Sequence, residues 1–194
     1  MLNKNRVIEI LKKTEVLQEG HFLLTSGKHS NQYMQCAKIL QYPNYAEEIA
    51  KGLAEEFKND KIDIVIGPAI GGIIIAYELA KQLQTKNLFA ERDNGKMTLR
   101  RGFTIPKGAR VLVAEDVITT GGSVFEVIDV VKEQGGEVAG VAVLVDRSNG
   151  KVDFNTKLRA ALTVEVLAYE EVECPMCKDG KIPLVKPGSR NIKQ

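Results

Sequence analysis

A thirteen-residue segment in the middle of the chain constrains the fold more than any other. Residues 111–123 run from four apolar residues through Glu115 and Asp116 to a Val-Ile-Thr-Thr-Gly-Gly-Ser sequence. The apolar run is typical of a buried strand, and Gly121 and Gly122 let the backbone approach a ligand closely before a helix begins. Backbone N–H groups at such a turn can bind a phosphate, and hydroxyl groups add donors. The segment therefore predicts a sugar-phosphate site at the carboxyl end of a strand, where α/β sheets bind ligands.

The paired acids suit the same kind of ligand. Glu115 and Asp116 can accept hydrogen bonds from vicinal ribose hydroxyls, or they can lie near a metal ion. A helix N-cap would explain one Ser or Thr, but it would not explain the whole run. The segment therefore favours a binding site over a purely structural turn.

From residue 62 onward, short apolar runs alternate with amphipathic helices. Strands are expected at 62–66, 110–114, 138–145 and 163–167, and helices with one apolar face at 76–83 and 124–131. Near-continuous Val and Ile runs are expected where helices cover both sides of a parallel sheet. The predicted fold class is therefore α/β, with a central, mostly parallel sheet flanked by helices, in a single domain of residues 1–194.

The flanking regions are less regular. Apolar spacing predicts helices over 7–17 and 46–57, and two short strands at 22–26 and 32–39 around a turn at 26–29. Residues 89–103, with a turn at 93–95, predict an extended hairpin. The tail from residue 174 is rich in Lys, Gly and Pro, and only partial regular structure is expected there.

Composition excludes several classes of protein. Charged residues make up 27% and hydrophobic residues 44% of the chain, and the net charge is only +2, so nothing global indicates a nucleic-acid partner. Residues 91–110 carry a local excess of Lys and Arg, which suits an anionic ligand but is also compatible with a solvated charged face. No stretch approaches the roughly 20 apolar residues that span a bilayer. We therefore expect a cytoplasmic protein with no membrane partner.

A second glycine turn, at residues 67–72, follows the strand expected at 62–66 and precedes a helix. It is another potential anion cradle, although glycine-rich turns of this kind are also common as structural elements. It is not a Walker P-loop, because Ile73 and Ile74 stand where Lys and Ser or Thr would be required.

Residues 111–123 resemble the motif that binds phosphoribosyl pyrophosphate (PRPP) in type I phosphoribosyltransferases. The resemblance implies that the two acids hold the ribose hydroxyls and that residues 119–123 hold the 5-phosphate. The PRPP-binding residues it predicts are Glu115, Asp116, Val117, Ile118, Thr119, Thr120, Gly121, Gly122 and Ser123. In that family the earlier glycine turn, here Ala69, Ile70 and Gly71, receives pyrophosphate, and Mg²⁺ is bound mainly through PRPP rather than by direct protein ligands.

The N-terminal run at residues 20–30, with Tyr33 and Met34 after it, resembles the start of the orotate phosphoribosyltransferases. In those enzymes it forms a small hood, expected here from about residues 1–40 and part of the tail. Arg147 matches the arginine that meets the orotate carboxylate, a role for which a guanidinium is well suited because it pairs bidentately with a planar carboxylate. The Thr119 position also contacts orotate in the family. The implied reaction transfers the 5-phosphoribosyl group from PRPP to orotate, giving orotidine 5'-monophosphate and pyrophosphate in pyrimidine biosynthesis.

The loop at 91–103 departs from the family pattern. Many relatives have a longer loop with two lysines and a histidine, and a lysine where Thr25 stands, whereas no histidine occurs in this loop. The catalytic role is therefore assigned to Lys96 and Arg92. In the family this loop reaches into the neighbouring subunit's site, which implies a homodimer.

Cys174 and Cys177 form a CxxC pair, which supplies half of a zinc site. The other ligands cannot be identified from sequence, since His21 and His29 lie far away along the chain. The favoured interpretation is that these cysteines have a structural or redox-silent role. The alternative is a zinc site shared across a dimer.

Two other functions compete with the main hypothesis. The first is an enzyme of the same fold that acts on a purine or uracil, which the carboxylate-binding arginine and the hood argue against. The second is a PRPP-sensing regulator that binds nucleic acid, for which residues 1–61 offer no helix-turn-helix with a basic recognition helix.

Overall fold

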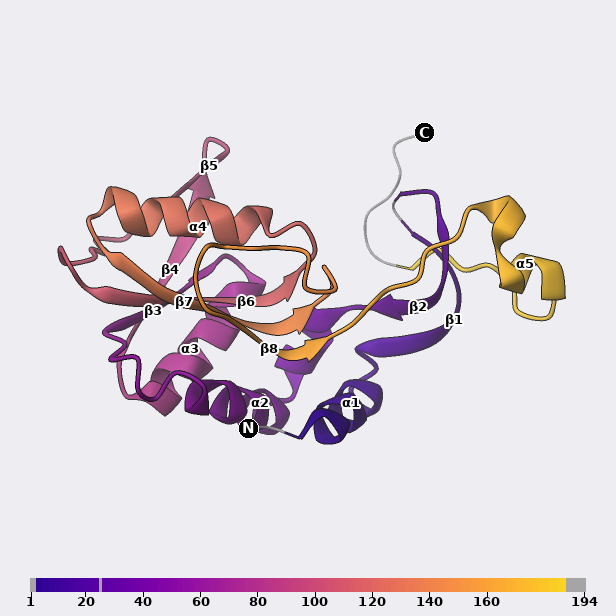
Figure 1. The fold of residues 1–194 in the computed structure, drawn as a ribbon, viewed down its shortest axis with the longest axis horizontal. Helices are drawn as coiled ribbons and strands as arrows, with labels where there is room; N and C mark the ends of the chain where they lie inside the picture. Colours follow the sequence, from indigo (N-terminus) through magenta and orange to yellow (C-terminus); the bar gives the residue numbers. More distant parts are fainter. Residues whose placement is uncertain (1–2, 25, 188–194) are drawn as a thin grey trace.

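The computed structural model describes residues 3–24 and 26–187, so Thr25 and the tail residues 188–190 lie outside the described part. A six-stranded sheet forms the centre of the fold (Figure 1). Its strands are β3 (Ile64–Pro68), β4 (Lys86–Asp93), β5 (Lys96–Thr98), β6 (Arg110–Ile118), β7 (Glu137–Asp146) and β8 (Leu158–Thr163). They lie in the order β5-β4-β3-β6-β7-β8, and all neighbours are parallel except β4 and β5. The prediction of an α/β fold with a mostly parallel sheet is therefore confirmed.

Helices cover both faces of this sheet. The longer ones are α1 (Lys4–Lys13), α2 (Pro43–Glu55), α3 (Gly71–Leu83) and α4 (Gly122–Glu133). In β6, Leu112 and Ala114 pack in the cluster that contains residues of α2 and α3, whereas Val111 and Val113 pack with α4. Figure 1 shows α4 on one side of the sheet and α2 and α3 on the other. Successive residues of a buried strand point to opposite faces, which explains why residues 111–114 of β6 are all apolar rather than alternately apolar.

Several expected boundaries were wrong. The strand expected at 32–39 ends earlier, because β2 (His29–Met34) is followed by the 3₁₀ helix η1 (Cys36–Gln41). The strand expected at 163–167 is β8, which lies at Leu158–Thr163 instead, where it pairs with β7. The expected hairpin at 89–103 is shorter on its second side, since β5 covers only Lys96–Thr98, and β4 belongs to the main sheet. Short apolar segments near turns do not fix their own ends, because tertiary pairing decides them.

A separate two-stranded sheet projects from one end of the molecule (Figure 1). Its strands are β1 (Leu17–Leu23) and β2, which pair in antiparallel fashion. Residues 164–187 lie against this hairpin and contain the short helices η2 (Glu171–Glu173) and α5 (Pro175–Asp179). Backbone bridges join Phe22 to Val185 and His29 to Tyr169. We call β1, β2 and residues 164–187 together the hairpin–tail unit.

Among the described residues, no helix is long and apolar enough to cross a membrane.

Candidate active site

The order of the strands creates a crevice between β3 and β6. After β3 the chain crosses to β4 on one side, and it then returns to β6 on the other side of β3. Parallel α/β sheets bind ligands at such a switch point, outside the carboxyl ends of the strands. The turn at 69–72 follows β3 and the turn at 119–121 follows β6. The fold therefore brings the two glycine turns predicted as anion cradles to the same edge of the sheet.

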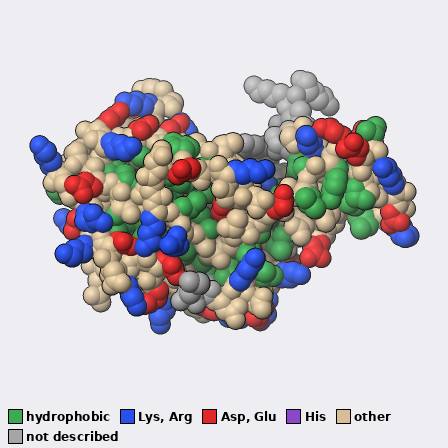
Figure 2. All heavy atoms as spheres, in the orientation of Figure 1, with side chains coloured by type: hydrophobic (Ala, Val, Ile, Leu, Met, Phe, Trp, Pro, Cys, Tyr) green, Lys and Arg blue, Asp and Glu red, His purple; other side chains and the backbone are tan. Residues whose placement is uncertain are grey.

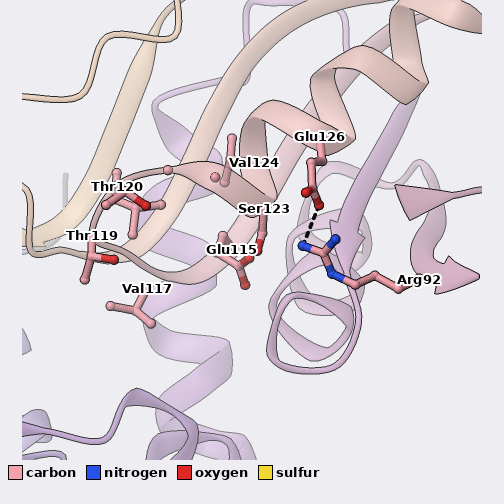
Figure 3. Close-up of a pocket in the computed structure, with 11 residues that line it drawn as sticks. Arg92, Glu115, Val117, Thr119, Thr120, Ser123, Val124 and Glu126 are labelled. Carbon is pink, nitrogen blue, oxygen red and sulfur yellow. Dashed lines mark ion pairs between the residues drawn. The ribbon is translucent and has the colours of Figure 1, made fainter. Parts of the chain in front are cut away.

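A cavity of about 250 Å³ lies at the end of β6 (Figure 3). Most of its lining comes from the segment predicted to bind PRPP. The lining residues are Arg92, Glu115, Val117, Ile118, Thr119, Thr120, Gly121, Gly122, Ser123, Val124 and Glu126. Within this lining, the first turn of α4 supplies free backbone N–H groups and Thr119, Thr120 and Ser123 supply hydroxyls, which together are the donors that a phosphate requires.

The conformation of Gly121 shapes one wall of this cavity. Its φ angle is +76°, in the left-handed region that favours glycine. A Cβ atom at this position would lie 2.8 Å from the Phe154 ring and 2.9 Å from a methyl carbon of Val152. The turn can therefore close against residues 152–154 only with glycine at 121, which explains one of the two glycines in the sequence.

The two acids lie between the glycine turns. β6 extends to Ile118, beyond the expected strand end at residue 114, so Glu115 and Asp116 lie within the C-terminal part of the strand. A Cβ atom on Gly71 would lie 2.5 Å from the Asp116 carboxylate, and one on Gly72 would lie 3.1 Å from that of Glu115. The glycines of the first turn therefore allow it to lie directly against the two acids of β6.

Burial changes the protonation of these acids. Glu115 is only 8% exposed, and one of its carboxylate oxygens accepts a hydrogen bond from the backbone N–H of Asp116 at 3.0 Å. Burial, and then the neighbouring charge of Asp116, raise the pKa of Glu115 far above the usual range of a glutamate. Burial also raises the pKa of Asp116. A cation, or hydroxyl groups that donate to these oxygens, would favour the charged form of the two acids. The acid pair can therefore bind a ligand of either kind.

The two residues predicted to be catalytic are not brought together. Arg92 reaches the cavity, where its guanidinium lies 2.6 Å from Glu126 (Figure 3). It also donates a hydrogen bond to the carbonyl of Gly95 at 3.0 Å. The Lys96 ammonium lies instead 3.6 Å from Glu133 near the other end of α4, and its side chain is 74% exposed. Of the pair, only Arg92 therefore lines the cavity of its own chain.

Arg147 lies beside the cavity, at the end of β7. Its backbone N–H donates to the carbonyl of Ile118 at 2.8 Å, and the Asp146 carboxylate accepts hydrogen bonds from the N–H groups of Ser148 and Gly150. The Nε atom of Arg147 is buried and has no hydrogen-bond partner among the described residues. A buried guanidinium N–H without an acceptor is costly, so this position is suited to a ligand that carries a carboxylate.

The remaining predicted ligand contacts, which include Asp116 and Gly71, lie outside the cavity lining. Tyr33 is half-buried on β2 and its ring packs against that of Phe22. Met34 is buried in the core beneath the sheet. Ala69 and Ile70 are exposed in the first glycine turn, where the N–H of Ala69 donates to the carbonyl of Ala90.

Sequence reasoning missed Glu126, which is the counter-charge of Arg92. It lies three residues after Ser123, hence on the same face of α4 as the end of the phosphate motif. That spacing was the available signal, but the pairing with a residue of β4 could not be known without the fold.

Magnesium suits the oxygen donors of this site. Mg²⁺ prefers carboxylate and phosphate oxygens and is commonly held by one or two carboxylates plus substrate phosphates. Glu115 and Asp116 present such oxygens between the two turns expected to hold phosphates. The residues of the crevice therefore fit the ion that the sequence predicts.

Comparison with known proteins agrees with this geometry. The phosphoribosyl transferase domain family matches residues 35–169. The chain is 59% identical to the orotate phosphoribosyltransferase of Caldanaerobacter subterraneus subsp. tengcongensis, over 98% of this chain and 100% of the relative. It is 58% identical to that of Caldicellulosiruptor bescii, over 97% and 99%. The crystal structure of orotate phosphoribosyltransferase from Aeropyrum pernix is similar with a TM-score of 0.66 at 27% identity, over 81% of this chain and 93% of that one.

Proposed function

The chain belongs to the orotate phosphoribosyltransferase family, and we propose that the crevice between β3 and β6 is where it moves the 5-phosphoribosyl group of PRPP to orotate. The reaction gives orotidine 5'-monophosphate and pyrophosphate, as a step of pyrimidine biosynthesis. One observation carries the proposed location. Both glycine turns and the acid pair meet at a single edge of the sheet.

The ligand's charged parts have separate places in this crevice. The 5-phosphate lies against the turn at 119–123, the ribose hydroxyls donate to Glu115 and Asp116, and the pyrophosphate lies at the turn of Ala69, Ile70 and Gly71. The distance between the turns is short because Gly71 lies against Asp116. PRPP carries its 5-phosphate and its pyrophosphate at opposite ends of one ribose, so two cradles flanking an acid pair match its shape.

The protein needs no nucleophilic side chain for this chemistry. The attacking nitrogen comes from orotate, and positive charge grows on the ribose ring as the bond to pyrophosphate breaks. Buried carboxylates beside the ring stabilise that positive charge, and alignment of the reactants supplies much of the remaining effect. Mg²⁺, when bound through PRPP beside Glu115 and Asp116, would neutralise part of the pyrophosphate charge.

Arg92 is placed to assist the leaving group. Its ion pair with Glu126 holds the guanidinium at the rim of the cavity (Figure 3). A pyrophosphate in the first turn offers more negative charge than one carboxylate, so Arg92 exchanges Glu126 for the leaving group as the charge develops.

Arg147 sets the choice of base. Its backbone N–H is held by the carbonyl of Ile118, and its buried Nε has no hydrogen-bond partner within the described part of the chain, so a planar carboxylate is a partner that would satisfy it. Orotate has such a group, whereas purine bases and uracil do not. Thr119 lies at the same edge and contacts the base. Tyr33 and Met34 lie on β2, one strand of the hairpin, and neither lines the cavity. We assign both residues to the hood over the base.

A substrate panel tests the proposal. Protein is incubated with PRPP and Mg²⁺ together with orotate, uracil, adenine or hypoxanthine, and consumption of each base is followed by its ultraviolet absorbance. We expect orotate alone to be consumed, with one pyrophosphate released for each orotate. Turnover of a purine with none of orotate would exclude the proposed role of Arg147, and no PRPP-dependent reaction at all would exclude the proposed site.

We propose further that the active form is a homodimer in which the loop at 91–103 serves the neighbouring site. Lys96 supports this, since it is exposed and lies away from the cavity of its own chain. Equal amounts of Lys96→Ala and Asp116→Asn proteins, each nearly inactive, are mixed under conditions that exchange subunits. If Lys96 acts across the dimer, half of the dimers gain one intact site, and about a quarter of wild-type activity returns. If Lys96 acts within its own chain, no activity returns.

A further inference from the structure

The second candidate site lies in the hairpin–tail unit, away from the crevice. Sequence analysis left Cys174 and Cys177 as half of a zinc site because no other ligand was near them along the chain. The structure brings His21 and His29 to them: one ligand atom from each of the four residues lies within 4.8 Å of every other. These are both histidines of the chain and two of its three cysteines, which meet although the two pairs are about 150 positions apart.

We propose that these four side chains bind a structural zinc ion, one per chain, in a tetrahedral Cys2His2 site. The ligand atoms are His21 Nε2, His29 Nδ1 and the two thiolate sulfurs. Two cysteines and two histidines form one of the standard ligand sets of structural zinc. This proposal is independent of the transferase reaction proposed above.

The distances between the ligand atoms agree with one ion at their centre. His21 Nε2 lies 3.0 Å from His29 Nδ1, 3.5 Å from Cys174 Sγ and 3.6 Å from Cys177 Sγ, and His29 Nδ1 lies 3.2 Å from Cys177 Sγ. Tetrahedral zinc with ordinary bond lengths separates two nitrogens by about 3.3 Å and a nitrogen from a sulfur by about 3.6 Å. The cluster therefore has the size of a zinc coordination sphere before any side chain moves.

The surroundings of His21 support a ligand role for its Nε2 atom. Its other ring nitrogen, Nδ1, lies 3.1 Å from the carbonyl oxygen of Ile182. A ring N–H that donates to a backbone carbonyl fixes the tautomer and leaves the opposite nitrogen free to bind metal, which is the usual outer contact of a zinc-bound histidine. His21, His29 and Cys174 are buried, whereas Cys177 is exposed, which gives an ion a route in.

The backbone around the cluster joins the same segments. The N–H of Val185 donates to the carbonyl of His21 at 2.8 Å, and His29 and Tyr169 exchange two backbone hydrogen bonds of 2.8 Å. The two histidines are thus held on neighbouring strands, and the CxxC turn at the start of α5 is held over them. Because main-chain hydrogen bonds position these residues, the site depends far less on individual side-chain rotamers than a cluster of surface side chains would.

The tail segment of the unit also lies outside the apolar core that would otherwise hold it. None of residues 166–187 belongs to either of the two hydrophobic core clusters. Several apolar side chains of this segment are instead at the surface, with Val172 81% exposed, and Figure 2 shows hydrophobic side chains exposed at the end of the molecule that carries it. Small units without a sufficient core commonly depend on a metal or disulfide cross-link, and zinc binding supplies that stability.

The first experiment measures metal content. Tag-free protein is purified without chelator and under reducing conditions, and zinc is determined by plasma mass spectrometry. We expect about one zinc per chain in the wild type, and less than about 0.1 in the Cys174→Ser/Cys177→Ser double variant. Cys36→Ala is the matched control, because Cys36 is a buried cysteine outside the cluster, and it should keep the full zinc content.

A second measurement does not depend on any variant folding. Wild-type protein is stripped of metal and titrated with Co²⁺, which reports its coordination through absorption. The proposal predicts intense visible bands of tetrahedral cobalt and a thiolate-to-cobalt charge-transfer band, both saturating at one equivalent. Chelation of the native protein should also make cleavage within residues 164–187 by a protease at least about tenfold faster, and Zn²⁺ should restore resistance.

Several results would overturn the proposal. These are zinc below about 0.1 per chain both as purified and after incubation with Zn²⁺, a weak octahedral cobalt spectrum, or a Cys174–Cys177 disulfide that persists under reducing conditions. Unchanged zinc content in the folded double-serine variant would equally exclude these ligands.

Discussion

The crevice at the end of the sheet and the hairpin–tail unit are built by different means. Around the crevice, Glu115 and its neighbours lie on a strand that is buried on both faces, so the packing of the whole sheet fixes their positions. In the hairpin–tail unit, segments 140 or more residues apart are joined by a few backbone hydrogen bonds and a cluster of histidines and cysteines. The first region is rigid by burial, whereas the second depends on local cross-links.

This difference separates the work of the two regions. Chemistry on a charged sugar requires carboxylates and N–H groups that do not reorganise during the reaction, and a buried strand end supplies them. The hairpin–tail unit lies away from the crevice, and segments held by few backbone hydrogen bonds are expected to open locally more often. The predictions below test this division, beginning with the largest effect.

Hydrogen exchange should show the difference in stability directly. Amides of Leu112 and Val143, in the middle of β6 and β7, should exchange only through global unfolding. Amides of Leu23 and Val185, which join β1 to the tail, should exchange roughly 10³-fold faster through local opening. Exchange is measured by mass spectrometry or NMR, with zinc present and after chelation. Chelation should increase the difference in exchange rate between the two regions. Equal protection of both regions from exchange would show that the hairpin–tail unit unfolds together with the sheet as one cooperative core.

Replacing Asp116 by Asn should affect the reaction far more than the fold. The substitution keeps the size of the side chain but removes the charge that, in the proposed mechanism, stabilises the developing positive charge on ribose. We expect kcat/KM to fall by about 10²–10³, as for loss of other preorganised electrostatic contacts, with little change in melting temperature. Steady-state consumption of orotate and thermal unfolding are measured together. Asp153→Asn, an exposed aspartate outside the cavity lining, is the control and should keep wild-type turnover. Near-normal turnover of Asp116→Asn would show that the acid pair does not act on the substrate.

Replacing Arg147 by Ala should weaken orotate binding selectively. Loss of a bidentate contact to a carboxylate in a partly buried place should raise the KM for orotate by about 10²-fold. The KM for PRPP should change little, because the phosphate cradles are intact. Arg147→Lys keeps the charge but loses the planar fork, so it should fall between the wild type and the alanine variant. Equal changes in both KM values would instead indicate that Arg147 supports the whole site.

The sequence predicted the local structure around the crevice because that structure is determined by residues close together in the chain. Strand, acid pair, glycine turn and helix follow each other within residues 111–123, and local patterns are what a sequence displays directly. The fold class followed from the alternation of apolar runs and amphipathic helices. Neither signal depends on which distant segments meet.

The parts that sequence could not predict all depend on distant segments meeting. The Arg92–Glu126 pair joins β4 to α4, and the His21–Cys174 contact joins residues 153 positions apart. The end of β2 and the position of β8 were also misjudged, since pairing with neighbours decides where a short strand ends. A CxxC pair with no ligand beside it in sequence was only half of a site until the fold supplied the other half.

The smallest predicted effect is the stability that the protein loses because Glu115 is buried. Burial, followed by the charge of Asp116, raises the pKa of Glu115, so near neutral pH the folded protein retains a proton that the unfolded chain releases. Stability therefore falls as pH rises from about 4.5, the ordinary glutamate value, through the raised pKa. Glu115→Gln should melt roughly 2–6 °C above the wild type at pH 8, and the two should melt together at or below the ordinary glutamate pKa. Calorimetry across this range, with the exposed Glu133→Gln as control, measures the effect. A gain of equal size at every pH would trace the stabilisation to packing rather than to the buried charge, and the acid pair would then impose no electrostatic cost on the fold.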